Sequence, residues 1–144
     1  MDRINEAFQE ILSSRGFPMK TEAKERHYEY KSRFELEETH YISIHVMLTK
    51  GEESSVGQIV FEDIAYCRNN AERAAWLEVI NELNNSDGVY YYFCLSEDNR
   101  VFMRYVTEVT QNIESYFNIL LQGPYLIQRI MPKLEEKFGP FVVR

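Results

Sequence analysis

The sequence has few of the residues that build catalytic loops. Only six glycines occur in 144 residues, and each is isolated, so no glycine-rich loop is present to cradle a phosphate group. The short motifs of serine hydrolases, zinc peptidases and cysteine–histidine enzymes are absent as well. We therefore predict that the protein is not an enzyme and carries no cofactor.

Cysteine and histidine are also scarce. Cys67 and Cys94 fall on different predicted elements without the spacing of a redox pair, and we expect two free thiols in a reducing cytoplasm. His40 and His45 lie on one predicted strand and point to opposite faces of it, while His27 begins another strand. A metal ion needs ligands that converge, so no metal site is predicted.

Positive charge and long apolar runs are lacking too. Lys and Arg number 16 against 23 Asp and Glu, and the net charge is −7. An acidic domain repels a phosphate backbone, so nucleic acid is not an expected partner. No apolar run approaches the roughly 20 residues of a membrane span, and the charged N-terminal segment has no apolar signal region. We expect a cytoplasmic protein that does not bind membranes, with residues 1–144 forming one domain.

Aromatic residues are abundant, and the apolar positions follow two clear periods. Helical spacing predicts helices over residues 2–15, 71–84 and 110–137. Alternation predicts strands over residues 28–36, 40–48 and 56–66, and a hairpin over residues 89–106. Residues 17–25 are predicted to form a polar connection. The order helix, three strands, helix, two strands, helix is typical of an α+β domain with a five-stranded antiparallel sheet covered by helices.

Two details of the helices are also predicted. The second helix should bury one apolar stripe, made of Ala74, Trp76, Leu77, Ile80 and Leu83. In the last helix, Gly123 and Pro124 should kink or divide the chain, because proline removes a helical hydrogen bond. A helix broken in this way would leave a gap against the sheet.

The predicted hairpin carries aromatic residues on both of its faces. If Ser96 pairs with Arg100 across a turn at Glu97–Asn99, one face is almost purely apolar and belongs to the core. That face holds Tyr91, Phe93, Leu95, Val101, Met103 and Tyr105. The opposite face holds Tyr90, Tyr92, Cys94, Phe102, Arg104 and Val106.

The second face is the best candidate for an interaction surface. Tyr and Arg are enriched among the residues that dominate protein interfaces, and exposed aromatic residues on a sheet form a binding-sized patch. We predict that Tyr90, Tyr92, Phe102 and Arg104 contact a partner. The alternative is that a helix of the same chain covers this face.

One carboxylate pair interrupts an apolar strand. Glu62 and Asp63 come late in the third predicted strand, where one of the two would point into the core unless a bulge intervenes. A bulge or a strand end is favoured over a catalytic pair, because catalytic carboxylates need a shared cleft.

The order of the elements and three stretches of sequence resemble the YbjN family of bacterial proteins and the related type III secretion chaperone-like fold. The stretches are Leu77–Asn84 at the end of a helix, Phe93–Tyr105 as a hairpin with an acidic turn, and Ile130–Leu134 with its proline. The three tyrosines at 90–92 and the Gly123–Pro124 step depart from the pattern. The resemblance implies a small, dimeric, cytoplasmic binding or chaperone-like module, and it brings no catalytic residue.

Three functions are therefore carried forward. The first is a non-catalytic, homodimeric interaction module that holds a protein or peptide partner on its sheet or along a helix. The second is a regulatory domain that senses a small molecule or peptide in a pocket between the last helix and the sheet. The third is an enzyme that uses Glu62 or Asp63.

Overall fold

The computed structural model describes residues 2–140, and these form one six-stranded antiparallel sheet with three helices. The strand order is β1-β2-β3-β4-β6-β5. The elements in chain order are α1 (Arg3–Ser14), β1 (Lys20–Ala23), β2 (His27–Glu37), β3 (His40–Thr49), β4 (Ser54–Tyr66), a short 3-10 helix (Asn70–Glu72), α2 (Arg73–Ser86), β5 (Tyr92–Leu95), β6 (Arg100–Thr110) and α3 (Ile113–Phe138). The predicted α+β class is confirmed, although the predicted number of five strands is wrong.

The extra strand is β1, which lies inside the segment that was predicted to be a polar connection. All four of its side chains are exposed, so its sequence shows neither the alternation nor the apolar residues of a strand. A tight turn holds it against β2, where the Lys24 N–H donates to the His27 carbonyl over 2.8 Å. Backbone pairing therefore forms this strand, and the pattern of apolar residues does not predict it.

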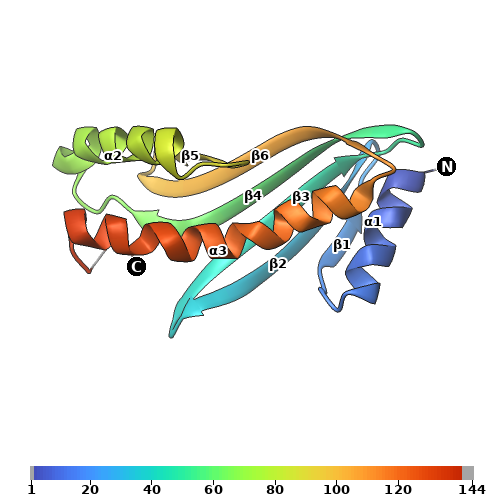
Figure 1. The fold of residues 1–144 in the computed structure, drawn as a ribbon, viewed down its shortest axis with the longest axis horizontal. Coiled ribbons are helices and arrows are strands. Elements are labelled where there is room, and N and C mark those ends of the chain that lie inside the picture. The colour runs from blue at the N-terminus through green and yellow to red at the C-terminus, as the bar shows by residue number, and fades with distance from the viewer. Residues whose placement is uncertain (1, 141–144) are drawn as a thin grey trace.

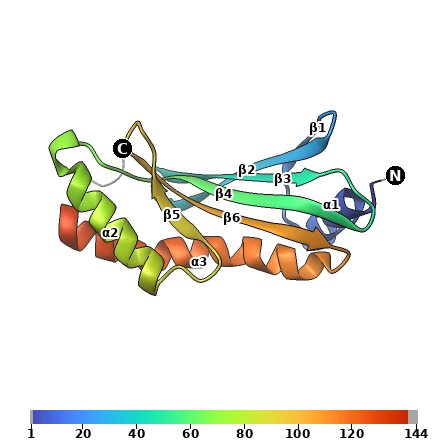
Figure 2. The same ribbon diagram turned by 90° about the horizontal axis from the view of Figure 1, so that it is seen from above.

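The helices pack on one face of the sheet, with α3 along the sheet and α2 beside β5 (Figures 1 and 2). In α1, Ile4, Phe8 and Leu12 recur at helical spacing and are buried, and the Asp2 carboxylate caps the helix by accepting from the Asn5 N–H. The Phe8 ring meets Tyr30 of β2 edge to face at 4.8 Å between centroids. The core therefore lies between the helices and this face, called here the covered face.

In α2, the buried residues differ from the predicted stripe. Trp76, Ile80 and Leu83 are buried as predicted, but Ala74 and Leu77 are exposed, and Val79 is buried instead. The physical reason is the position of α2 at the border of the sheet, where it contacts β5 and, through Trp76 stacked on Phe138, the end of α3. A narrow contact buries a narrower stripe than sequence periodicity alone suggests.

The last helix is continuous, so the predicted division at Gly123–Pro124 is wrong. Both Pro124 and Pro132 lie inside the 26-residue helix α3. Gly123 is buried and lies so close to the Phe61 ring of β4 that a Cβ atom at this position would overlap the ring. The glycine therefore brings the helix onto the sheet, and the ring fills the place where a gap was expected.

Candidate interaction face

The opposite face of the sheet has no helix over it within residues 2–140 (Figure 2). Apolar side chains on this side gather on three neighbouring strands, β4, β6 and β5. We call this surface the open apolar face, and it consists of Val56, Val60, Tyr92, Cys94, Phe102, Val106 and the polar pair Gln58 and Arg104. Further along the sheet on this side, β3 adds Met47 and the exposed ring of Tyr41, and β2 presents charged residues.

Strand register brings most of the predicted interaction residues together. Tyr92 lies opposite Arg104 across β5 and β6, and Arg104 lies opposite Val60 of β4. Cys94 lies opposite Phe102 in the next row. The Arg104 Nε donates to the Gln58 Oε1 over 2.7 Å, which fixes the guanidinium beside Gln58 on this face.

Tyr90 does not lie with the other three predicted residues. Tyr90 was assigned to this face because side chains alternate along a strand. Strand β5 begins only at Tyr92, so this alternation does not reach Tyr90. Its ring packs on Tyr105 at 6.0 Å between centroids, and it lines a small hollow of about 150 Å³ with Tyr125 of α3. The open apolar face therefore includes Tyr92, Phe102 and Arg104, while Tyr90 belongs to the border of the sheet beside α3.

The covered side of the same hairpin is closed by specific hydrogen bonds. The Tyr91 hydroxyl donates to the Ile119 carbonyl of α3 over 2.7 Å, and burial raises the pKa of this hydroxyl far above its usual range. Asn84 of α2 binds both backbone groups of Phe93 through its side-chain amide, which closes the outer edge of β5. This amide clasp has no signal in the sequence, since asparagine at the end of a helix more often marks only a stop.

A β-bulge in β4 borders the open apolar face, as predicted for the Glu62–Asp63 pair. The pairing of β4 with β6 shifts between Phe61 and Ala65, and Asp63 has a left-handed φ of 64°. Glu62 is exposed, whereas the Asp63 side chain turns back toward neighbouring strands. The bulge therefore removes the expected conflict of a carboxylate pointing into the core.

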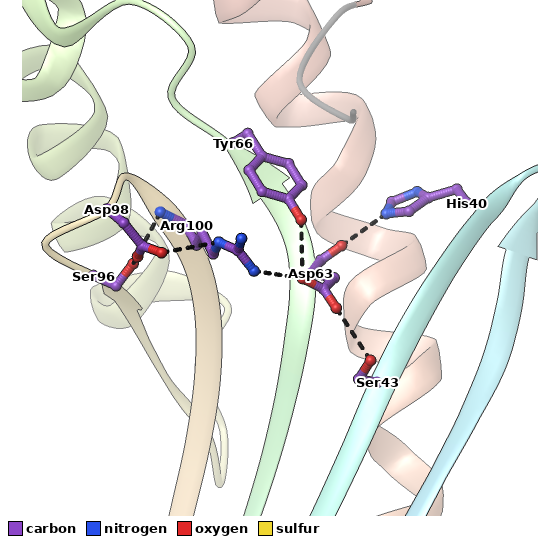
Figure 3. Close-up of polar contacts among 7 residues, drawn as sticks. All are labelled: His40, Ser43, Asp63, Tyr66, Ser96, Asp98 and Arg100. Atoms are coloured by element: carbon purple, nitrogen blue, oxygen red, sulfur yellow. Dashed lines mark hydrogen bonds and ion pairs between the residues drawn. The ribbon is translucent and has the colours of Figure 1, made fainter.

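The Asp63 carboxylate is held by three neighbours (Figure 3). Its two oxygens accept from the Ser43 hydroxyl at 3.1 Å and from the Tyr66 hydroxyl at 2.9 Å, and Arg100 approaches one of them at 3.5 Å. The backbone carbonyl of Asp63 is 3.0 Å from the His40 Nε2. Because both oxygens are engaged, these contacts explain the left-handed backbone as part of a polar clamp between β3, β4 and β6.

The turn between β5 and β6 belongs to the same cluster. Asn99, the last residue of the predicted turn, has a left-handed φ of 64°, and the Arg100 Nε pairs with Asp98 at 3.0 Å. Arg73 of α2 donates to the Ser96 carbonyl over 2.9 Å and ties the turn to the helix. Between this turn and the bulge lies a hollow of about 460 Å³. It is lined by Val60, Glu62, Asp63, Ser96, Asp98, Arg100, Val101, Phe102 and Arg104.

The other candidate groups remain separate from each other. Over residues 2–140 no three potential metal ligands of the His, Cys, Asp or Glu type come together. Cys67 and Cys94 are free thiols, and burial raises the pKa of each. A thiol with a raised pKa is protonated at neutral pH, which makes it a poor nucleophile.

Comparison with known proteins adds no family. No family model and no curated protein matches this sequence. Within residues 2–140, none of the helices combines the length and the apolar character needed to cross a membrane. The fold of residues 2–140 is therefore that of an α+β domain in which helices cover one face of an antiparallel sheet and the other face is open and partly apolar.

Proposed function

We propose that this protein is a non-catalytic, chaperone-like interaction module that holds a partner protein on its open apolar face. The observation that carries the proposal is the apolar surface on β4, β6 and β5, opposite the side on which the helices pack. Exposed apolar patches of a few hundred Å² that are rimmed by polar residues mark interaction sites in soluble proteins.

The exposed fractions support a surface with available contact area. Tyr92 and Val106 are each 41% exposed, and Val56 is 50% exposed, although all three lie in regular strands. At the centre, Arg104 is already held by Gln58. A guanidinium held in this way loses little conformational freedom when a partner binds, which favours affinity.

The hollow beside the patch extends the same surface. It adjoins Phe102 and Arg104, and its walls are the fixed turn and the fixed bulge. A side chain of a partner that lies across β6 would enter this hollow and meet both charges and an aromatic ring. Rigid walls of this kind are suited to recognition.

Substitution on the open apolar face tests the proposal. Val106→Asp places a charge in the patch, and Tyr125→Asp on α3 is the matched control, because Tyr125 is even more exposed but lies on the helical side. We expect Val106→Asp to abolish partner binding in a co-purification experiment from the native host, while Tyr125→Asp leaves it unchanged. The double substitution Tyr92→Ala and Arg104→Ala should act like Val106→Asp. Identical partners and identical mass in solution for all variants would contradict the proposal.

Self-association is part of the proposal, as the expected homodimer. Sedimentation velocity of the purified protein measures it directly. If the second copy occupies the open apolar face, Val106→Asp converts the dimer to a monomer. If a dimer persists in this variant, the copies meet elsewhere and the open apolar face remains available to a different protein.

The sensing alternative rests on a pocket between the sheet and α3. At Gly123 the Phe61 ring occupies this place, but smaller hollows adjoin α3 elsewhere, including one of about 150 Å³ near Tyr105 and Tyr116. A thermal-shift screen against metabolites tests this function, since a ligand that binds the native state raises the melting temperature. A screen without any shift would count against it.

A further inference from the structure

The outer edge of β2 is covered along only part of its length. Strand β1 pairs with residues 28–31 of β2, whereas β2 continues to Glu37. Along residues 32–37, β2 is the outermost strand of the sheet in the described part of the chain (Figure 1). The opposite border of the sheet differs, because Asn84 of α2 closes the edge of β5 there.

The hydrogen bonds between β1 and β2 show which residues of β2 point their backbone N–H and C=O groups outward at this edge. The bond from the Lys24 N–H to the His27 carbonyl makes these two residues a hydrogen-bonded pair. Every second residue of β2 then faces β1, so Glu29 and Lys31 bond to β1, and the next outward positions are Arg33 and Glu35. A register shift between Glu35 and Glu37 ends the regular edge. Two consecutive bonding positions are thus available for another strand.

A hollow lies beside this edge on the covered side. It has a volume of about 270 Å³ and is lined by Leu36, Glu37, Gln128, Met131, Pro132 and Glu135. Leu36, Met131 and Pro132 make an apolar floor, and the two glutamates supply negative charge without any basic residue in the lining. Since Pro132 has no N–H, the Gln128 carbonyl also lacks its usual helical donor. An aliphatic stem that ends in a cation fits this combination.

We propose that an extended, basic segment of a partner protein adds to the sheet as a strand along Arg33–Glu35 and inserts a lysine or arginine into this hollow. Side chains alternate along a strand, so an inserted residue opposite Phe34 points to the covered side, where the hollow lies next to Leu36. The net charge of −7 attracts such a segment. Strand addition gives affinity through backbone bonds, and the hollow gives selectivity.

A second copy of this chain fits the edge less well. Antiparallel pairing of two β2 strands about Phe34 would set Arg33 opposite Glu35 favourably, but it would carry Glu37 into the place opposite Lys31 that Lys20 of β1 already fills. It would also bring Phe34, not a cation, to the position beside the hollow. Pairing about Glu35 would set two Glu35 carboxylates opposite each other, which is destabilising. The edge therefore favours a different protein, and this inference is independent of the open apolar face.

The test uses a fluorescent peptide in which lysine alternates with valine, and a matched peptide in which glutamate replaces lysine. We expect the lysine peptide to bind the full chain in fluorescence anisotropy and the glutamate peptide not to bind. Glu135→Lys should weaken binding by about tenfold or more. Glu136→Lys is the control, because Glu136 is the next residue on α3, is exposed and does not line the hollow.

A second variant tests the strand itself. Glu35→Pro removes an outward N–H without removing a backbone bond to β3, so the variant should fold, as circular dichroism can check, and should lose the peptide. Glu35→Ala is its control and should keep the peptide, because it also loses the carboxylate that accepts from the Thr39 N–H but retains its own N–H. Amide exchange at Arg33 and Glu35 should slow when the lysine peptide binds to the unmodified chain. Absent binding, equal binding of both peptides, or equal loss in Glu135→Lys and Glu136→Lys would overturn the proposal. Val106→Asp should leave peptide affinity unchanged, which separates this site from the open apolar face.

Discussion

The two faces of β4 and β6 carry similar residues but have different environments. On the covered face, Ile59, Phe61 and Met103 are fully buried beneath α3. On the open face, Phe102 is half-buried and Val106 is largely accessible. The comparison teaches that aromatic and aliphatic content alone does not define a core in a one-layer sheet. Position relative to the helices decides which side stabilises the fold and which side is available for binding.

The largest expected change is in the free energy of unfolding when a phenylalanine of the covered face is replaced, compared with one of the open face. Phe61→Ala removes a fully buried ring that contacts Gly123, and we expect a loss of about 3–5 kcal/mol in the free energy of unfolding. Phe102→Ala on the open face should cost less than about half of this, because its ring keeps part of its contact with water. Urea unfolding of both variants measures the difference. Equal losses of stability would contradict the view that only the covered face belongs to the core.

Raising the pH above 10 should lower the stability of the fold, because the tyrosines of the covered face are buried. Burial raises the pKa of Tyr30, Tyr91 and Tyr116, so the native state keeps these protons after an unfolded chain would release them. Their contribution is complete below the unfolded pKa near 10 and declines above it, because only the unfolded state then gains from ionisation. At pH 10.5 we expect a total loss of about 2–3 kcal/mol.

Absorbance of tyrosinate measures this titration. Tyr30, Tyr91 and Tyr116, whose pKa burial raises, should ionise only as the chain unfolds. Tyr91→Phe should flatten the fall of stability above pH 10. If these three tyrosines released their protons while the protein was still native, the covered face would not be closed to water.

Gly123→Ala should show how closely α3 approaches the covered face. The added methyl group overlaps the Phe61 ring, and we expect a loss of about 1–3 kcal/mol from overpacking, even though alanine is the better helix former. Gln122→Ala, at the neighbouring exposed position, should change stability by less than about 0.5 kcal/mol. Thermal unfolding compares the two variants. A gain in stability for Gly123→Ala would mean that the helix can move away from the sheet.

The smallest expected change in stability comes from removing single buried hydroxyl groups, and it should differ between Tyr91 and Tyr116. Tyr91→Phe removes a donor from the Ile119 carbonyl and should cost about 1 kcal/mol. The Tyr116 hydroxyl is buried without a hydrogen-bond partner among the described residues, so Tyr116→Phe should be neutral or stabilising. Urea unfolding of both variants provides the measurement, and equal destabilisation would show that the Tyr116 hydroxyl also has a partner in solution.

Local features of the fold could be predicted because they depend on neighbouring residues. The alternation of Ile42, Ile44 and Val46 defines a buried row, and the turn at Asn99 fixes the register of Phe93 against Met103. The bulge at Asp63 follows from a carboxylate inside an apolar strand. Strand β1 could not be predicted, since exposed polar residues form it through backbone bonds alone.

The candidate site was predictable in part for the same reason. Parity along a strand places Tyr92, Phe102 and Arg104 on one face, but it does not reveal that β5 begins after Tyr90. Val60 and Val56 complete the patch only because β4 pairs with β6, which is a long-range choice. Gln58 orients Arg104 through that same pairing.

The sequence by itself determined the helices, most strands, the hairpin register and the bulge, because each depends on the spacing of residues close together in the chain. Only the tertiary structure decided whether a helix also covers the second apolar face of the hairpin. Alternation along the hairpin assigned one face to the core, but the other face also carries large apolar side chains, so periodicity could not show whether a helix covers it too. The close approach of Gly123 to Phe61, which places α3 on one side, resolves that choice.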